Sequence, residues 1–372
     1  MSDTEIIRVD LFEYTLTYAH GDYVMSSGRV VNALPSLVVK LTTEGGSTGY
    51  GEACPLGATY LPAFAAGARA AIKFMAPGLL GADVANLARV WTRMDDLLSG
   101  HLYAKSAVDI ACWDALGRTL GMPVAELLGG RLQDELPLYV AVPMGAPEQM
   151  AEFVLHQRAL GIHRFQMKLG DDPVVDAQRA AAIVAATDGS DLVIADANGG
   201  WRRQDAIVAV RLLEPLDRLL LEQPCPTMEE CLAIRKLTRL PMVLDEVIVD
   251  TTSLVRAISH QGMDHINLKI GRVGGLSRAC VMRDLAVDLG IRLTVEDTWG
   301  GDLTAAAVSH LAAGVPPASL FAASFMNDWT NEHVAGYQPR SGSGRGPVPK
   351  GPGLGVDVDE ETLGRPVFTV AR

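Results

Sequence analysis

The chain has 372 residues, of which 48% are hydrophobic and 20% charged. This balance supports a sizeable buried core and excludes a disordered protein. At about 150 residues per domain, the length predicts two domains, or one barrel-sized domain with an addition. With 32 basic and 44 acidic residues, the net charge is −12, which disfavours nucleic acid or an anionic membrane as a partner.

The cysteines and the N-terminal segment indicate a reducing compartment. Five cysteines in a chain of this length, none in a CxxC pair, do not form a disulfide framework or a thiolate zinc site. The first residues, MSDTEIIRVD, contain no hydrophobic signal core. No apolar run reaches the length of about 18 residues that a membrane helix needs. These features predict a soluble cytoplasmic protein.

The first third of the sequence changes from strand to helix patterning. Residues 5–15 and 36–42 are predicted as strands, and an EGG turn follows the second. Residues 103–120 carry apolar side chains at helical spacing. Strands followed by helices are typical of an α+β unit, so we predict an α+β capping domain over residues 1–130.

The next two hundred residues alternate strictly between short apolar strands and helices. The predicted strands are LPLYVAV, FQMKLG, LVIADAN, LLLEQP, MVLDE, HINLKI, RLTVEDT and SLFAAS. The predicted helices are 148–160, 174–186, 203–214, 228–238, 251–260, 274–289 and 303–314. Eight strands with seven helices between them favour an α/β fold, a modified (β/α)7β TIM-like barrel over residues 131–337. Residues 338–372 are expected to return to the capping domain, and their first part, 338–355, is rich in Gly and Pro.

A charged residue ends or directly follows six successive barrel strands. These residues are Lys168, Asp196, Glu222, Asp245, Lys269 and Asp297. The gaps between them are 28, 26, 23, 24 and 28 residues, each the length of one βα unit. A single charge at a strand end is ordinarily the start of a solvated loop. Six in register predict one active-site mouth, because the carboxyl ends of barrel strands meet at one face.

Three neighbouring carboxylates within this series predict a metal site. Asp196, Glu222 and Asp245 belong to adjacent strands and would repel one another without a cation. Hard oxygen ligands without nearby Cys or His favour Mg²⁺, with Mn²⁺ as the alternative. Asn198 shares the strand parity of Asp196, so it is expected to support a metal ligand or a bound water. Glu246 is expected to point away from the site and to support the metal ligands indirectly.

The two lysines indicate proton transfer. Lys168 and Lys269 lie on the second and sixth strands, at opposite points of an eight-strand ring, with Gln166 and Asn267 facing inward beside them. A lysine serves as a base when its surroundings depress its pKa. Removal of the α-proton of a carboxylate substrate would give an ene-diolate that a bound Mg²⁺ stabilises. The competing interpretation is that the lysines only neutralise the acidic cluster.

Several motifs make the whole chain resemble one family. They are AKSAVDIACWDALG at 104–117, LLGG at 127–130, the carboxylate spacing, LKIGRVGGL at 268–276 and GPGLG at 351–355. The sequence is similar to enolase-superfamily proteins of the muconate lactonizing/mandelate racemase type. Within that type it resembles the hydroxyproline group, the dehydratases of cis-3-hydroxy-L-proline and the 2-epimerases of hydroxyproline betaine. The shared pieces are GEACPLGATY at 51–60, GHLYAKSAVDIA at 100–111 and EDTWGGD at 296–302.

The resemblance implies roles for particular residues. It makes Asp196, Glu222 and Asp245 the ligands of Mg²⁺ and makes Lys168 and Lys269 the acid/base pair. The resemblance also implies that Tyr60 closes over the substrate from the capping domain. It implies that Asp297 meets a polar substrate group, although parity does not decide between Asp297 and Glu296. The substrate-binding set is Tyr60, Gln166, Asn198 and Asp297.

Departures from the family pattern bear on the substrate. The second strand ends QMK rather than KxK, so it offers one lysine. Betaine epimerases of the group carry a tryptophan on strand eight, suited to a quaternary ammonium, and Ser324 takes that position here. The resemblance therefore favours dehydration of cis-3-hydroxy-L-proline to the cyclic imine 1-pyrroline-2-carboxylate. The alternative is a 2-epimerase or racemase of hydroxyproline, proline or their betaines.

Two further hypotheses belong to other classes. The first is a Schiff-base aldolase barrel that uses Lys168 or Lys269, against which the carboxylate triad argues. The second is a non-catalytic relative, which would be expected to lack part of the triad or the lysines. The partners expected are a small cyclic amino acid and further copies of the chain in a homo-oligomer, without nucleic acid or membrane.

Overall fold

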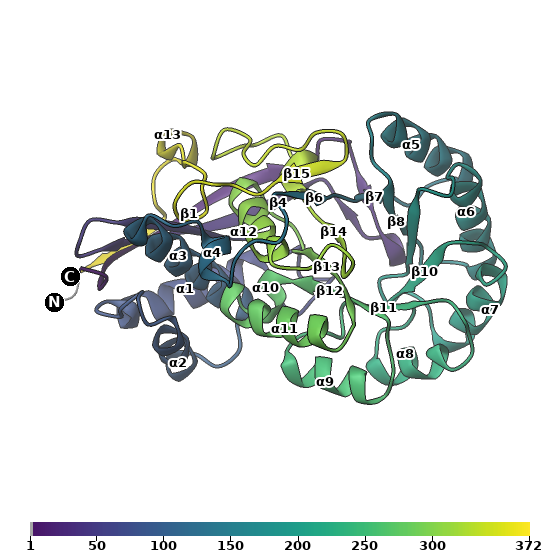
Figure 1. Ribbon diagram of the computed structural model, residues 1–372, viewed down its shortest axis with the longest axis horizontal. Helices are drawn as coiled ribbons and strands as arrows, with labels where there is room; N and C mark the ends of the chain where they lie inside the picture. Colours follow the sequence, from purple (N-terminus) through teal and green to yellow (C-terminus); the bar gives the residue numbers. More distant parts are fainter. Residues whose placement is uncertain (1–2) are drawn as a thin grey trace.

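The computed structural model describes residues 3–372, and Figure 1 shows a helix-and-sheet domain beside a barrel. The first domain contains a four-stranded sheet in the order β16-β1-β4-β5. The ladders from β16 to β5 are antiparallel, and the two chain ends lie next to each other because β16 pairs with β1. The strands are β1 (Ile6–Thr17), β4 (Ala33–Thr43), β5 (Thr48–Ala53) and β16 (Phe368–Ala371). The helices are α1 (Ala65–Leu79), α2 (Leu87–Leu97), α3 (Leu102–Leu120) and α4 (Val124–Leu127).

Helix α3 lies directly against the backbone of β5. A Cβ atom on Gly51 would come 2.1 Å from the carbonyl oxygen of Ala107, so only glycine allows this approach. The close contact buries α3 along most of its length. On its other side, Asp109 of α3 accepts hydrogen bonds from the backbone N–H and hydroxyl of Ser277 in the barrel domain. The helix therefore joins the two domains.

The second domain is an eight-stranded parallel sheet in the order β14-β13-β12-β11-β10-β9-β8-β7. An isolated parallel bridge between Leu138 and Ala323 joins its two edges, so the sheet closes into a barrel. The strands are β7 (Val140–Val142), β8 (Arg164–Lys168), β9 (Leu192–Asp196), β10 (Leu219–Glu222), β11 (Met242–Leu244), β12 (His265–Lys269), β13 (Arg292–Glu296) and β14 (Leu320–Ala323). The predicted barrel with a capping domain is confirmed.

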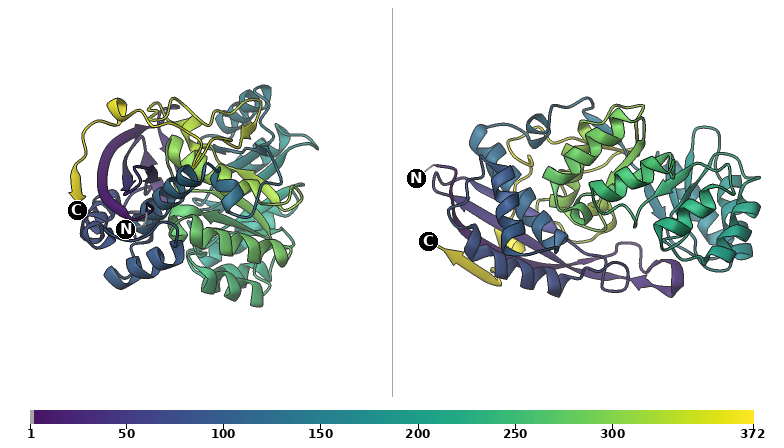
Figure 2. Two further views of the ribbon diagram at one scale, coloured as in Figure 1. Left: turned by 60° about the vertical axis from the view of Figure 1, so that its left-hand side comes forward. Right: turned by 90° about the horizontal axis from the view of Figure 1, so that it is seen from below.

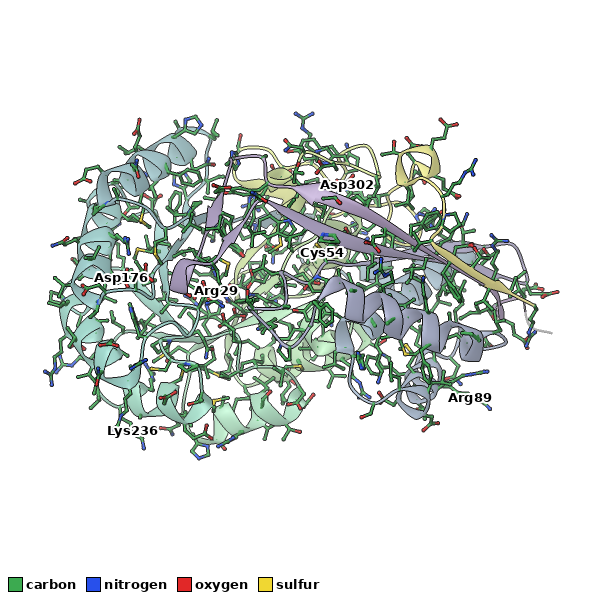
Figure 3. All side chains as sticks on the ribbon, turned by 180° about the vertical axis from the view of Figure 1, so that it is seen from behind. Arg29, Cys54, Arg89, Asp176, Lys236 and Asp302 are labelled. Atoms are coloured by element: carbon green, nitrogen blue, oxygen red, sulfur yellow. The ribbon has the colours of Figure 1, made fainter. Side chains whose placement is uncertain are left out.

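Helices follow the barrel strands and form its outer layer (Figure 1). They are α5 (Pro147–Ala159), α6 (Pro173–Ala185), α7 (Arg203–Leu213), α8 (Met228–Arg235), α9 (Thr251–Ser259), α10 (Ile270–Val273), α11 (Leu276–Asp288) and α12 (Asp302–Ala313). Charged side chains such as Lys236 extend outward, whereas Cys54 and Asp302 are buried (Figure 3). Among residues 3–372, no helix combines the length and the apolar character needed to cross a membrane.

Segments from both ends of the chain reach the barrel. The short hairpin of β2 (Tyr23–Val24) and β3 (Val30–Val31) contains the 3-10 turn η1 (Ser26–Gly28), and the Met144 N–H donates to the Val24 carbonyl. Figure 2 shows the N-terminal strands running alongside the barrel domain. The remaining elements are β6 (Glu135–Pro137), which pairs with β15 (Arg345–Pro347), η2 (Met326–Trp329) and α13 (Glu360–Leu363). The domain boundaries at 131 and 338 stay a prediction.

Candidate active site

The three carboxylates predicted to bind metal come from neighbouring strands at the carboxyl end of the barrel. Asp196 and Glu222 are the last residues of β9 and β10 and lie opposite each other in the ladder. Asp245 directly follows β11, and all three side chains are buried. Burial, and then the charges of Asp196 and Asp245, raise the pKa of Glu222 well above its usual value. This mutual influence indicates that the three carboxylates form one cluster.

Two amides from opposite sides of the ring hold the carboxylate of Glu222. The side-chain N–H of Gln166 donates to its oxygens at 3.0 and 3.1 Å, and that of Asn267 donates at 2.7 Å. Both amides lie on strands that also end in a lysine, two residues further on. The alternation of β8 and β12 thus points Gln166, Lys168, Asn267 and Lys269 into the barrel, as the strand parity predicted.

Each lysine forms an ion pair with one of the other two carboxylates. Lys168 Nζ lies 2.5 Å from Asp196 Oδ2, and Lys269 Nζ lies 2.8 Å from Asp245 Oδ2. Burial opposes the charge of both lysines, but the carboxylates outweigh it and raise their pKa values above the usual range. In this arrangement the carboxylates favour the charged form of both lysines.

Further groups surround the pair of Lys269 and Asp245. Arg272 of α10 donates from Nη1 to Asp245 Oδ1 at 2.7 Å and to its backbone carbonyl at 2.6 Å. The Tyr60 hydroxyl lies 3.2 Å from Asp245 Oδ2 and 3.3 Å from Lys269 Nζ. Although burial acts in the opposite direction, Arg272 and Lys269 lower the pKa of Asp245. Tyr60 therefore contacts both Lys269 and Asp245 from the capping domain.

Asn198 and Glu246 lie beside the carboxylate cluster and contact each other. The backbone N–H of Asn198 donates to Asp196 Oδ1 at 2.8 Å, and its side-chain amide donates to Glu246 Oε1 at 3.1 Å. Burial raises the pKa of Glu246 to about 7, and the charges of Asp245 and Asp196 add to this rise. Glu246 is thus electrostatically part of the cluster, although strand alternation predicted that it points away.

The structure distinguishes the two candidate acids at the end of β13. Glu296 is the last strand residue; its carboxylate accepts the Tyr139 hydroxyl and lies 3.5 Å from Lys269 Nζ. Asp297 accepts two backbone N–H groups, from Gly271 at 2.9 Å and Thr298 at 2.6 Å. Burial raises the pKa of Asp297 to about 7 against these hydrogen bonds. Glu296 is directed toward the lysines, whereas both oxygens of Asp297 are held by the loop backbone.

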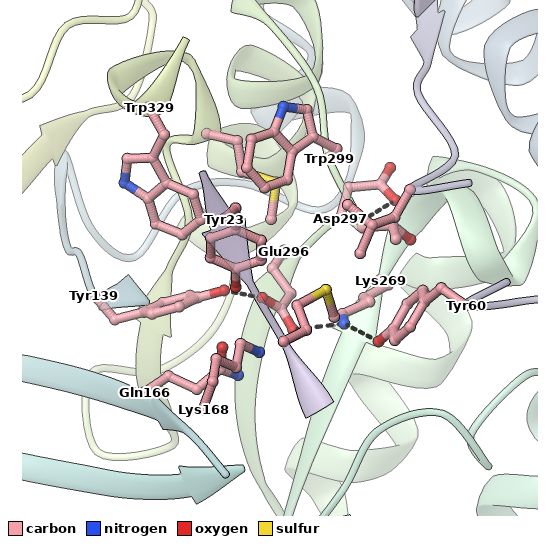
Figure 4. Close-up of a pocket in the computed structure, with 14 residues that line it drawn as sticks. Tyr23, Tyr60, Tyr139, Gln166, Lys168, Lys269, Glu296, Asp297, Trp299 and Trp329 are labelled. Atoms are coloured by element: carbon pink, nitrogen blue, oxygen red, sulfur yellow. Dashed lines mark hydrogen bonds and ion pairs between the residues drawn. The ribbon is translucent and has the colours of Figure 1, made fainter. Parts of the chain in front are cut away.

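The cavity between these side chains is small and has aromatic walls (Figure 4). Its volume is about 20 Å³, which is room for about one water molecule. Tyr23, Tyr139, Trp299 and Trp329 line it, and Ser324 does not. A substrate larger than a water molecule therefore needs some of the lining side chains to move.

Sequence patterns do not predict three of these aromatic residues. Trp299 belongs to the EDTWGGD motif, whereas Tyr23, Tyr139 and Trp329 belong to no motif that carries the family resemblance. Tyr139 is the one residue with a polar tip in the apolar stretch LPLYVAV, a feature that could have marked it. Trp329 ends the 3-10 turn after β14, where no strand periodicity indicates the direction of a side chain.

The donor set suits a divalent metal in its chemistry. The three buried carboxylates repel one another when ionised, and a bound cation would reduce this repulsion. Mg²⁺ prefers oxygen ligands of this kind. As the side chains stand, no group of three acidic, His or Cys residues within residues 3–372 is arranged to hold a metal. The ion pairs explain this, because Lys168 and Lys269 take the oxygens of Asp196 and Asp245. A metal ion at these residues would compete with the lysines for those oxygens.

A capping domain on a barrel with acidic strand ends defines an enolase-type enzyme, and comparison with known families agrees. Residues 13–129 match the N-terminal domain family of mandelate racemase/muconate lactonizing enzyme. Residues 149–362 match the enolase C-terminal domain-like family. The chain therefore belongs to the mandelate racemase/muconate lactonizing enzyme family of the enolase superfamily, which confirms the resemblance seen in its motifs.

Relatives of this chain include a dehydratase and a racemase. It is 43% identical to the cis-3-hydroxy-L-proline dehydratase of Roseibium aggregatum, over 98% of this chain and 99% of the relative. It is 28% identical to the N-succinyl-L-Arg/Lys racemase of Bacillus cereus, over 92% of each chain. A crystal structure of an enolase-superfamily member from Roseovarius nubinhibens, complexed with magnesium, superimposes with a TM-score of 0.93 at 34% identity, covering 99% of this chain and all of the other.

Proposed function

We propose that this enzyme removes water from cis-3-hydroxy-L-proline to give 1-pyrroline-2-carboxylate. One structural observation carries the proposal: two lysines approach from opposite strands of the barrel, β8 and β12, with the carboxylate cluster between those strands. The identity of 43% to a cis-3-hydroxy-L-proline dehydratase over nearly the full length of both chains supports the substrate.

The stereochemistry of this substrate matches two opposed lysines. In cis-3-hydroxy-L-proline the hydroxyl and the carboxylate share one face of the ring, so the α-hydrogen lies on the opposite face from the hydroxyl. One lysine, as the neutral amine, would remove the α-proton, and the other, as the ammonium, would donate a proton to the departing hydroxyl. The C–H and C–O bonds break, water leaves, and the resulting enamine tautomerises to the cyclic imine.

The remaining residues would bind and orient the substrate. Mg²⁺, or Mn²⁺, held by Asp196, Glu222 and Asp245 would stabilise the negative charge that develops on the substrate carboxylate. Gln166 and Asn267 keep Glu222 in place, and Glu246 supports the cluster through Asn198.

A positively charged ring nitrogen would be attracted by Glu296 or Asp297, and by the faces of Trp299 and Trp329. Tyr60 would cover the substrate on the side of Lys269.

A second candidate is a 2-epimerase of hydroxyproline, proline or their betaines. The same opposed lysines favour it, since a proton removed from one face can return to the other. Relatives at 28% identity include a racemase and L-Ala-D/L-Glu epimerases. The two reactions share the removal of the α-proton and differ in the fate of the hydroxyl.

Proton NMR in D₂O with purified enzyme and Mg²⁺ separates the candidates. We expect cis-3-hydroxy-L-proline to lose its hydroxyl and form the cyclic imine. Trans-3-hydroxy-L-proline should react at least about 10²-fold more slowly, because its hydroxyl and α-hydrogen share one face and only one lysine reaches both. Inversion at the α-carbon with deuterium uptake and an intact hydroxyl would contradict dehydration and establish the epimerase.

A further inference from the structure

A second, larger cavity lies behind the tyrosine that covers Lys269. Its volume is about 460 Å³, against about 20 Å³ between the two lysines. It is bounded by the segment before α1, the turn between α2 and α3, and the loop between β11 and α9. Leu61, Phe64, Leu102 and Val249 supply apolar walls, and Arg272 lines it as well. No step of the proposed reaction uses this cavity.

Arg272 has unused hydrogen-bonding capacity beside the cavity. Only 3% of the residue is exposed, and Nη1 is bound to Asp245. Its Nε and Nη2 atoms are buried and have no hydrogen-bond partner among residues 3–372. Buried charged donors without acceptors are costly, and the planar guanidinium edge formed by Nε and Nη2 suits two oxygens of one carboxylate.

Two helices begin at the same cavity. Helix α1 starts after Phe64 and helix α3 after His101, and both of these preceding residues line the cavity. In the described chain, neither helix has a side-chain cap or an acidic residue in its first turn. The unpaired N–H groups of a first turn carry partial positive charge. The cavity therefore combines apolar walls with positive potential from three sources.

We propose that this cavity binds a small carboxylate with an apolar body, such as an aryl or alkyl acid. The carboxylate would pair with Nε and Nη2 of Arg272, and the apolar body would contact Leu61, Phe64 and Val249. The site is separate from the pocket between the lysines, so the proposal does not depend on the reaction assigned to that pocket. Because the other edge of Arg272 binds Asp245, an occupant would contact the group that holds one predicted metal ligand.

The test uses three probes that share one ring and differ in charge. Phenylacetate, 2-phenylethanol and 2-phenylethylamine are titrated calorimetrically into the full-length enzyme with Mg²⁺. We expect phenylacetate to bind at least about tenfold more tightly than the alcohol, and the amine most weakly. Similar affinities for all three, or no binding of phenylacetate, would overturn the proposal. This comparison uses the unchanged protein and does not depend on the folding of any variant.

Two variants at one exposed wall residue locate the probe. Val249 is 39% exposed and belongs to no helix or strand. V249D places a negative charge at the wall, and V249N is its neutral match. We expect V249D to weaken phenylacetate binding roughly fivefold and V249N less than about twofold. If V249D and V249N change the affinity for phenylacetate equally, the probe does not bind at this wall. If Lys168→Met abolishes binding and V249D retains it, the probe binds between the lysines. Either result would overturn the site.

Discussion

The two sides of the barrel mouth hold their lysines differently. Lys168 pairs with one carboxylate, Asp196, directly across the ladder between β8 and β9. Lys269 contacts the carboxylates of Asp245 and Glu296 and the hydroxyl of Tyr60. Each lysine also has a hydrogen-bonded tyrosine from the capping domain, Tyr23 at Lys168 and Tyr60 at Lys269. The two predicted proton-transfer groups therefore differ in the number of carboxylates that they contact, one against two.

The largest effect is expected from removing the metal, which should affect both sides equally. Treatment with EDTA and dialysis should lower turnover of cis-3-hydroxy-L-proline roughly 10³-fold or more, because nothing then stabilises the charge on the substrate carboxylate. Proton NMR measures turnover, and added Mg²⁺ should restore it. Activity that survives EDTA and is trapped by borohydride would instead indicate Schiff-base chemistry.

Replacing each lysine tests whether the sides have distinct roles. Lys168→Met and Lys269→Met should each lower turnover by about 10²–10⁴-fold. Exchange of the α-hydrogen in D₂O should persist in the variant that keeps the base and be lost in the other. The matched control is Lys105→Met, which removes a buried lysine paired with Asp95 in the capping domain. Equal exchange in both active-site variants would contradict a division into acid and base.

Removing the Tyr60 hydroxyl should disturb only the Lys269 side. Tyr60→Phe is expected to lower kcat/KM about tenfold, since a hydrogen bond to charged groups contributes about 1.5 kcal/mol or more. Tyr50→Phe is the control, because its hydroxyl binds Glu360 away from the site. Steady-state kinetics with both variants measures the difference. An unchanged kcat/KM in Tyr60→Phe would show that this hydroxyl does not support Lys269.

The smallest effect on turnover is expected at a histidine that touches neither lysine and acts on stability instead. His310 Nδ1 accepts the N–H of Ala125 at 3.1 Å, and Nε2 donates to the carbonyl of Leu354 at 2.9 Å. These contacts require the neutral ring, and burial lowers the pKa of His310 to about 4. The unfolded chain takes up this proton near pH 6.5. Stability is therefore complete above pH 6.5 and falls as the pH drops toward 4.

That loss should reach about 3 kcal/mol at most. Urea unfolding of the wild type and His310→Gln between pH 7 and 4.5 measures it. The variant should show a shallower decline, whereas His260→Gln, at an exposed histidine, should match the wild type. A parallel decline in all three proteins would show that His310 is not the cause.

Much of the fold could be predicted because the βα repeat is regular. The helix expected over 103–120 is α3, Leu102–Leu120, and the strand expected over 36–42 is β4, Ala33–Thr43. Strand parity also placed Gln166 and Asn267 correctly on the inner face. It failed to decide between Glu296 and Asp297, because a strand's last residue and the loop residue after it follow different backbone rules. Tyr139, just before β7, and Trp329, in the 3-10 turn after β14, lie outside the strands, where alternation does not indicate the direction of a side chain.

By itself, the sequence determined the barrel, its capping domain, the family, and the strand ends that carry charge. It could do so because one βα unit has a nearly constant length and an apolar strand alternates its faces. Only the tertiary structure decided that Tyr60 contacts Lys269, that Glu296 points at the lysines, and that one edge of Arg272, beside a second cavity, has no partner among residues 3–372. Those contacts join residues up to about two hundred positions apart, through loops whose paths no local periodicity specifies.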